Sequence, residues 1–275
     1  KFYLIDIDLL FFLFLIFLVG FLADFRILKS PLIRFGIQII VLFLFIIYLD
    51  LSILEIRISW FDSLLRNENF NIFFVLFCFL VLINGSNFID GLNGLSCGYF
   101  LILVLSVLLL NTEYSIPLKG IELFKYFSFI LGVFLIFNFF NKNYMGDNGI
   151  YFISALIGYY LIELSNLNIK QISPIYIVSL LWYPAFENLF SIIRRTYGRS
   201  IITGPDNFHL HALIYKRFKL KYNTLFSNNI SSLIILFSCL PGFILSNIFH
   251  YQSFILGMII FLNVFIYLNA YFFLN

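Results

Sequence analysis

Long apolar segments, separated by short polar stretches, run through the whole chain. Each segment approaches the roughly 20 residues that a helix needs to cross a bilayer core of about 30 Å. The segments are too long and continuous for the strands of a barrel, the only other structure that crosses lipid. We therefore predict an all-α, polytopic membrane helix bundle with nine transmembrane helices, at about residues 6–22, 32–49, 70–87, 95–111, 124–140, 150–166, 174–190, 230–249 and 252–273.

The composition also indicates a membrane protein. Hydrophobic residues make up 62% of the 275 residues and charged residues only 11%, whereas soluble domains are about half apolar and a quarter charged. The net charge of +3 is too small to indicate a nucleic-acid partner. Cys78, Cys97 and Cys239 lie in apolar segments without the spacing of a disulfide framework or a zinc site. We interpret residues 1–275 as one transmembrane domain.

Charged residues are divided unequally between the two sets of loops. Counting helices places loops 23–31, 88–94, 141–149 and 191–229 on one side, and loops 50–69, 112–123 and 167–173 on the other. The first side carries most of the basic residues: Arg26, Lys29, Arg34, Lys142, Arg194, Arg195, Arg199, Lys216, Arg217, Lys219 and Lys221. The second side is poorer in them and holds Asp50, Glu55, Asp62, Glu68, Glu113 and Glu122. By the positive-inside rule, the first side faces the cytoplasm.

Four unusual polar clusters lie on that same side. They read LADFRILKSPLIR (22–34), NGSNFIDGLNG (84–94), NKNYMGDNG (141–149) and RRTYGRSIITGPDNFHLHALIYKR (194–217). Unrelated loops would not be expected to place their unusual residues on one side of the membrane. We therefore predict a single site at the cytoplasmic surface.

Two clusters place a carboxylate beside glycines. In MGDNG, Asp147 could approach a hard cation such as Mg²⁺, or Asp147 or Asn148 could cap the following helix; alone, the motif favours the cap. In NFIDGLNG, Asp90 and Asn93 are three residues apart and share a face if the segment is helical. With Asn84 and Asn87 they form a polar stripe, which is costly at membrane depth without a partner. Here a functional interpretation is favoured.

The cluster DNFHLH contains Asp206, His209 and His211. Alternating histidines could bind a metal, but this spacing has little specificity. Because several arginines and lysines surround them, an anionic ligand such as a phosphate is the better interpretation. The alternative is a juxtamembrane basic segment that contacts anionic lipid headgroups. That alternative accounts for the basic residues but not for the histidines.

Taken together and in this order, the clusters resemble the polyprenyl-phosphate N-acetylhexosamine-1-phosphate transferases, glycosyltransferase family 4. NGSNFIDGLNGL is similar to the family motif Asn-x-x-Asn-x-x-Asp-Gly-x-Asp/Asn-Gly-Leu, YMGDNG to Met-Gly-Asp-x-Gly, and PDNFHLHALIYKR to the cytoplasmic histidine loop. The likeness runs from about Gly20 to Arg217. PAFENLFSIIRR (184–195) is more similar to the glycan-initiating branch than to the peptidoglycan branch. Members have more spans than nine, and this chain begins with Lys1, so we expect that N-terminal helices are missing.

The resemblance implies transfer of a sugar-1-phosphate from a UDP-N-acetyl-aminosugar to polyprenyl (undecaprenyl) phosphate, with release of UMP. This would be the first membrane step of cell-envelope glycan synthesis, for example of lipopolysaccharide, at the cytoplasmic face of a bacterial inner membrane. The implied cofactor is Mg²⁺, with Mn²⁺ as an alternative. The implied catalytic residues are Asp24, Asp90, Asp147, His209 and His211; the metal ligands are Asp147 and Asp90; the substrate-binding residues are Arg34, Asn84, Asn87, Asn93 and Arg199. The sequence leaves open the sugar and whether a homodimer forms.

One position departs from the family. Its first signature is a pair of adjacent aspartates, which here reads Ala23-Asp24. The missing aspartate is one candidate for the base that deprotonates the lipid phosphate, so a catalytically impaired member is an alternative. A phosphate monoester is, however, already largely dianionic near neutral pH, because its second pKa is about 6. A transporter is the second alternative, but it should carry ionisable residues near the middle of several spans, and the exceptions Glu163 and Glu187 lie near span ends.

Overall fold

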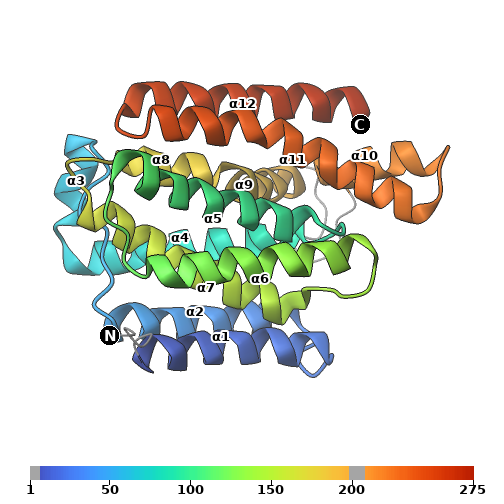
Figure 1. The fold of residues 1–275 in the computed structure, drawn as a ribbon. Helices are drawn as coiled ribbons and strands as arrows, with labels where there is room; N and C mark the ends of the chain where they lie inside the picture. Colours follow the sequence, from blue (N-terminus) through green and yellow to red (C-terminus); the bar gives the residue numbers. More distant parts are fainter. Residues whose placement is uncertain (1–6, 198–207) are drawn as a thin grey trace.

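The computed structural model describes residues 7–197 and 208–275, and these residues form twelve α-helices and no strand (Figure 1). Eight helices are long and apolar enough to cross a membrane. They are α1 (Ile7–Asp24), α2 (Pro31–Tyr48), α4 (Glu68–Ile89), α5 (Leu95–Tyr114), α6 (Ile121–Phe139), α7 (Gly146–Leu167), α11 (Thr224–Ile248) and α12 (Ser253–Leu274). The prediction of an all-α, polytopic membrane bundle is confirmed.

The predicted span 174–190 is not one straight helix. The chain instead forms α8 (Pro174–Leu180) and α9 (Trp182–Tyr197), which meet at an angle of 72°. Pro184 lies in the first turn of α9, where a helix needs no backbone N–H, so a new helix can begin just before it. Two short helices inside predicted loops were also missed: α3 (Ser59–Leu65) and α10 (Leu210–Lys219).

Several helices begin at capping residues that the sequence supplies. The side chains of Asn67 and Asn223 accept hydrogen bonds from the backbone N–H groups of Phe70 and Phe226, at 3.0 and 2.8 Å. Ser30 precedes Pro31 at the start of α2, which combines an N-cap with a proline in the first turn. These residues explain why the apolar runs become helices with defined starts.

The central helix of the bundle is α7. Of its most apolar 18-residue window, 78% is buried within the protein, compared with 17% for α6 and for α12. Two glycines allow neighbouring helices to pack closely against each other. A Cβ at Gly20 of α1 would lie 2.5 Å from the backbone of Asn148, and one at Gly85 of α4 would lie 2.1 Å from the carbonyl oxygen of Pro184.

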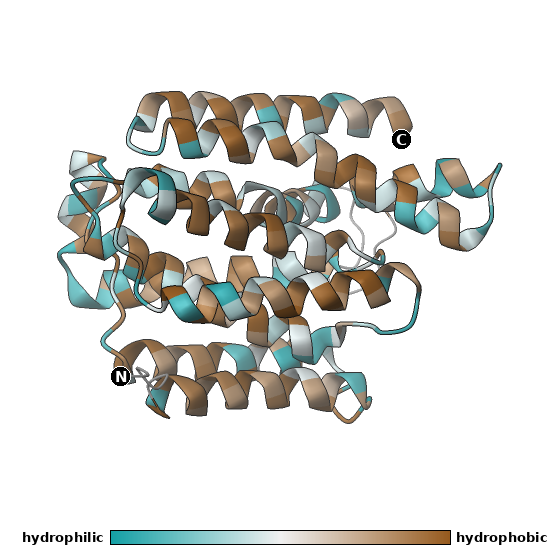
Figure 2. Cartoon of the chain, viewed as in Figure 1, coloured by the Kyte–Doolittle hydropathy of each residue, from teal (hydrophilic) through white to brown (hydrophobic). Residues whose placement is uncertain are grey.

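The described parts of the polar clusters gather at one end of the bundle, on the right in Figure 1. There α1, α4 and α6 end, and α2, α5 and α7 begin. Coloured by hydropathy, the long sides of the bundle are mainly hydrophobic, and hydrophilic residues concentrate toward the helix ends (Figure 2). Loops that are far apart in the sequence therefore meet in space at this end.

Candidate active site

A cavity of about 1090 Å³ lies at this end, bounded mainly by α2, α4, α9 and α10. Part of its wall is apolar and comes from α2, α4 and α9: Pro31, Leu32, Phe35, Phe77, Leu80, Val81, Leu189 and Ile192. The other part is polar and includes Arg34, Gln38, Asn84, Asn87, Asp147, Tyr151, Asn188, Ser191, Arg195, His209, His211, Tyr215 and Asn228. One cavity thus combines a hydrophobic side with a concentration of charged and amide groups.

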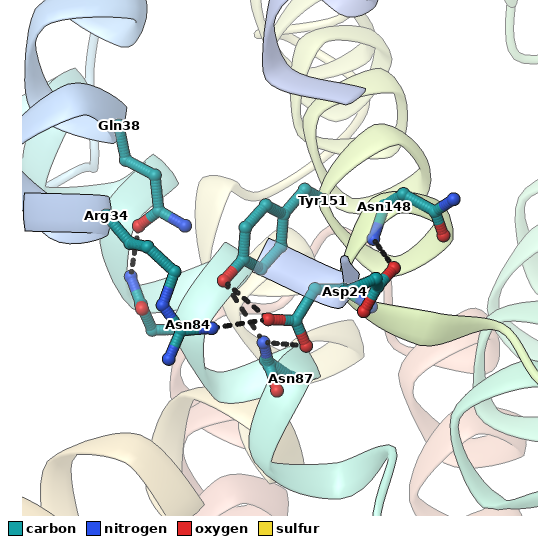
Figure 3. A network of polar contacts seen from close by, with 8 residues as sticks. Asp24, Arg34, Gln38, Asn84, Asn87, Asn148 and Tyr151 are labelled. Carbon is teal, nitrogen blue, oxygen red and sulfur yellow. Dashed lines mark hydrogen bonds and ion pairs between the residues drawn. The ribbon is translucent and has the colours of Figure 1, made fainter. Parts of the chain in front are cut away.

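Asp147 is at the centre of the polar part. Its Oδ2 accepts a hydrogen bond from Arg34 Nη1 at 2.6 Å, and its Oδ1 accepts one from Asn87 Nδ2 at 3.0 Å (Figure 3). Tyr151, one turn further along α7, donates its hydroxyl to Asp147 Oδ2 at 3.5 Å. Residues from α2, α4 and α7 therefore converge on one carboxylate.

Asp24 reaches the same region from the end of α1. Its two carboxylate oxygens accept hydrogen bonds from the backbone N–H groups of Asp147 and Asn148, at 3.0 and 3.2 Å. These N–H groups have no partner within the helix, and the positive end of the helix dipole favours an anion there. The cap suggested for Asp147 is therefore supplied by Asp24, whereas Asn148 Oδ1 accepts from the N–H of Gly149 at 2.6 Å.

The backbone conformation at Gly146 explains why a glycine precedes Asp147. Its φ of +68° lies in the left-handed region, where side chains are strained. A Cβ at this position would also lie 2.7 Å from Asp24 Oδ2. A larger residue would therefore disturb both the turn into α7 and the contact with Asp24.

Asn84 joins the site through α2. Its Nδ2 donates to Gln38 Oε1 at 3.3 Å and to the carbonyl oxygen of Leu80 at 2.8 Å. Gln38 was not among the predicted site residues, although it is the single amide inside the apolar span 32–49. A polar side chain at membrane depth needs a partner, and this signal could have identified it.

Asp90 and Asn93 do not share a helix face. Helix α4 ends at Ile89, and the chain then turns through Gly94, whose φ is +79°. Asp90 accepts a hydrogen bond from the Ser96 hydroxyl, whereas Asn93 donates its Nδ2 to Asn141 Oδ1 at 2.9 Å. Neither residue lines the cavity, although Gly91 and Leu92 between them do.

Burial changes the acidity of Asp90. Loss of hydration raises the pKa of its carboxyl group to about 7. The hydrogen bond from Ser96 lowers this pKa, and the negative charges of Asp147 and Asp24 raise it. Asp24, Asp90 and Asp147 are therefore close enough to influence each other electrostatically.

His209 and His211 both line the cavity, with their rings stacked at 5.4 Å and an interplanar angle of 6°. His209 Nδ1 lies 2.7 Å from Oε2 of the buried Glu187, and His211 Nδ1 lies 3.9 Å from Oε1 of the same residue. From the sequence, Glu187 was noted only as an ionisable residue near the end of a span. Arg199 and Asp206 lie outside the described residues.

The site fits a divalent cation only if water or substrate supplies some of the ligands. Within residues 7–197 and 208–275, no group of three or more His, Cys, Asp or Glu side chains could hold a metal ion. Mg²⁺, however, is commonly bound through one or two carboxylates together with water and substrate phosphates. Asp147, with the Asn87 amide beside it, fits a cation that takes its remaining oxygen ligands from a substrate. Asp90 as a second ligand stays a prediction.

Comparison with known proteins agrees with the family resemblance of the sequence motifs. The sequence model described as glycosyl transferase family 4 matches residues 7–165, more than half of the chain. A probable undecaprenyl-phosphate N-acetylglucosaminyl 1-phosphate transferase of Bacillus subtilis is 33% identical over 138 residues, which cover 46% of this chain and 36% of that protein.

Mycobacterial proteins are also similar to the chain. The decaprenyl-phosphate N-acetylglucosaminephosphotransferases of Mycolicibacterium smegmatis and Mycobacterium tuberculosis are 29% identical over 184 residues and 27% identical over 187 residues. Each alignment covers 58% of this chain and 44% of the relative. The chain therefore matches less than half the length of these relatives.

Proposed function

This chain belongs to glycosyl transferase family 4, and on that premise we propose that it transfers N-acetylhexosamine-1-phosphate from a UDP-sugar to a polyprenyl phosphate. The similar proteins are named as transferases that act on undecaprenyl or decaprenyl phosphate. These names favour an enzyme over the transporter that the sequence left open. The observation that carries the proposal is the cavity with one apolar and one polar side.

The apolar side suits a lipid substrate. Leu32, Phe35, Phe77, Leu189 and Ile192 line the cavity and are also exposed on the surface of the bundle. In a membrane, such a surface contacts hydrocarbon, so a polyprenyl tail can occupy it without losing its apolar surroundings. The phosphate at the end of the tail would then lie near Arg34.

The polar side suits the nucleotide sugar. Lipid phosphate and UDP-sugar are both anions, so the site must supply positive charge and alignment, as in other phosphoryl transfers. An oxygen of the lipid phosphate would attack the β-phosphorus of the UDP-sugar. The bond from that phosphorus to the bridging oxygen breaks, and UMP leaves with this oxygen.

The residues around the cavity then have distinct roles. Arg34 would pair with phosphate, Asn84 and Asn87 would donate hydrogen bonds, and His209 and His211 would face the diphosphate. A divalent cation, Mg²⁺ or Mn²⁺, at Asp147 would stabilise the negative charge of the diphosphate. Asp90 and Asn93 would support the loop behind these groups.

Asp24 would act by holding the start of α7 and therefore Asp147. The hydrogen bonds to Asp147 and Asn148 come from Asp24 itself, so this role does not require an aspartate at Ala23. The departure at Ala23 bears instead on the base that would deprotonate the lipid phosphate. If that phosphate enters as a dianion, no such base is needed.

We place the reaction at the cytoplasmic face of a bacterial inner membrane. Most of the Lys and Arg residues that the structure describes lie at the end of the bundle that holds the cavity, which supports a cytoplasmic orientation. The product would be the first lipid-linked intermediate of a cell-envelope glycan.

The proposal is tested by a transfer assay. Membranes containing the protein are incubated with radiolabelled UDP-N-acetylhexosamines, undecaprenyl phosphate and Mg²⁺. Label should move into the organic phase with an equal amount of UMP, and both should disappear when either the lipid phosphate or Mg²⁺ is omitted. Label that stays in the aqueous phase with every UDP-N-acetylhexosamine would contradict the proposal.

A further inference from the structure

Glu187 is the most deeply buried acidic residue beside the cavity. It lies on α9, its relative exposure is 1%, and it does not line the cavity itself. The two histidines lie between it and the cavity. A buried carboxylate is costly unless hydrogen bonds and opposite charge compensate it, so its partners must be chemically specific.

The contact with His209 fixes the position of a proton. Glu187 Oε2 and His209 Nδ1 are 2.7 Å apart. An ionised carboxylate only accepts hydrogen bonds, so with Glu187 ionised the hydrogen lies on His209 Nδ1, in either the neutral or the cationic ring. Oε1 of Glu187 accepts no hydrogen bond from the described residues and faces His211 Nδ1 at 3.9 Å.

Neighbouring residues hold the two rings in this arrangement. Phe88 packs against His209 with ring centroids 5.1 Å apart, and His211 stacks on His209. A Cβ at Gly91 would lie 3.0 Å from His211 Nε2. Because Nδ1 of each ring faces Glu187, Nε2 lies on the opposite edge of each ring.

Other ionisable groups also surround Glu187. The hydroxyl groups of Tyr183 and Tyr267 interact electrostatically with it from α9 and α12. Arg194 and Arg195 follow on the same helix. The two tyrosines are neighbours of the carboxylate but do not line the cavity. They therefore serve as control positions.

We propose that Glu187 is a positioning residue for the histidine pair. It keeps a proton on Nδ1 of His209 and holds both imidazoles with their Nε2 edges toward the cavity. The Nε2 edges would then face a diphosphate bound in the cavity. The identity of that ligand rests on the proposed function, whereas the arrangement of the histidines does not.

The arrangement can be measured directly because the chain has three histidines, His209, His211 and His250. Two-bond ¹H–¹⁵N correlation spectra of ¹⁵N-histidine-labelled protein report which ring nitrogen carries hydrogen. We expect a protonated Nδ1 for His209, assigned with His209→Gln. In Glu187→Leu this preference should be lost, because the acceptor is gone.

The same spectra contain an internal control. His250 Nδ1 lies 2.8 Å from the carbonyl oxygen of Asn247 at the opposite end of the bundle. Its signals should not change in Glu187→Leu, which shows that the variant is folded. A His209 Nδ1 that lacks hydrogen in the wild type, or that keeps it unchanged in Glu187→Leu, would overturn the inference.

Kinetics provide a second test. Glu187→Gln keeps the shape and an acceptor oxygen but removes the charge, and we expect kcat to fall roughly tenfold to hundredfold, as for other carboxylates behind functional histidines. Glu187→Asp should recover part of the loss, and Tyr183→Phe should stay near wild type. An unchanged kcat in Glu187→Gln would contradict the role. Absence of transfer by the wild type would instead contradict the proposed function and leave the NMR result interpretable.

Discussion

The two ends of α7 carry similar ion pairs in different surroundings. Near its start, Arg34 Nη1 lies 2.6 Å from Asp147 Oδ2; near its other end, Lys119 Nζ lies 2.6 Å from Glu163 Oε2. A tyrosine one turn away completes each group: Tyr151 donates to Asp147, and Tyr159 accepts from Lys119. Pair geometry alone therefore does not distinguish them.

The surroundings do distinguish them. Arg34 and Asp147 line the cavity together with amides and histidines, whereas Lys119 and Glu163 do not line it. The Lys119 side chain is 52% exposed, and its contact fastens the segment before α6 to α7. A charged pair indicates a site only when a cavity and further converging polar groups accompany it.

The largest difference should be seen when the two carboxylates are neutralised. Asp147→Asn should lower transfer roughly a hundredfold to thousandfold, because it removes the carboxylate proposed to hold the cation, and metal-assisted charge stabilisation contributes several kcal/mol. Glu163→Gln should stay within about twofold of wild type, since exposed pairs contribute about 0–1 kcal/mol. Initial rates of UMP release measure both. Equal losses in the two variants would contradict the claim that only the Arg34–Asp147 pair belongs to the active site.

The two cations should also differ. Arg34→Gln should lower transfer roughly tenfold to hundredfold, because a charge that pairs with phosphate is lost. Without nucleotide, the same variant should bind Mn²⁺ more tightly, since Arg34 competes with a metal ion for Asp147. Electron paramagnetic resonance of free Mn²⁺ measures this affinity, and Lys119→Gln is the matched control. Weaker Mn²⁺ binding by Arg34→Gln would contradict the competition.

Asp24 should matter for the stability of this end. Asp24→Ala removes both side-chain hydrogen bonds to the first turn of α7 and should cost about 1 kcal/mol. Asp24→Asn should cost less, because one acceptor oxygen remains. Thermal unfolding in detergent compares the two variants with wild type. No destabilisation in Asp24→Ala would show that the cap is not important for folding.

A smaller effect should appear in the pH dependence of stability. Burial raises the pKa of Asp90 to about 7, from the ordinary aspartate value of about 3.9. Between these values the folded chain holds a proton that the unfolded chain has released, so rising pH favours unfolding. Asp90→Asn should remove this contribution, and its advantage in Tm over wild type should grow from pH 5 to pH 8. The measurement is made without divalent cations; a constant difference would contradict the raised pKa.

Much of the fold could be predicted from the apolar segments. Eight predicted spans correspond to eight helices of the structure, because hydrophobic length is what the bilayer requires. The bend between Leu180 and Trp182 was missed because both halves are apolar. Only Pro184 indicates a new start, and a proline near a helix start can also lie within one helix.

The site was less predictable because partners come from distant segments. The resemblance to the family indicated roles for Asp147, Arg34 and Asn87, but only the structure brings these three side chains into contact. Asp24 and Asn93 make hydrogen bonds to residues far away in the sequence, at the start of α7 and at Asn141, which sequence spacing could not indicate. Glu187 was not predicted as a site residue, because its burial beside two histidines is visible only in three dimensions.

The most direct test of the central claim is to locate the lipid. A diazirine-bearing polyprenyl phosphate is cross-linked to the protein in membranes, and the labelled peptides are identified by mass spectrometry. We predict labels near Leu32, Phe35 and Phe77, lost when unlabelled undecaprenyl phosphate competes. Competable labelling confined to α6 or α12, with none on the cavity wall, would contradict the claim that the lipid phosphate meets its partner in this cavity.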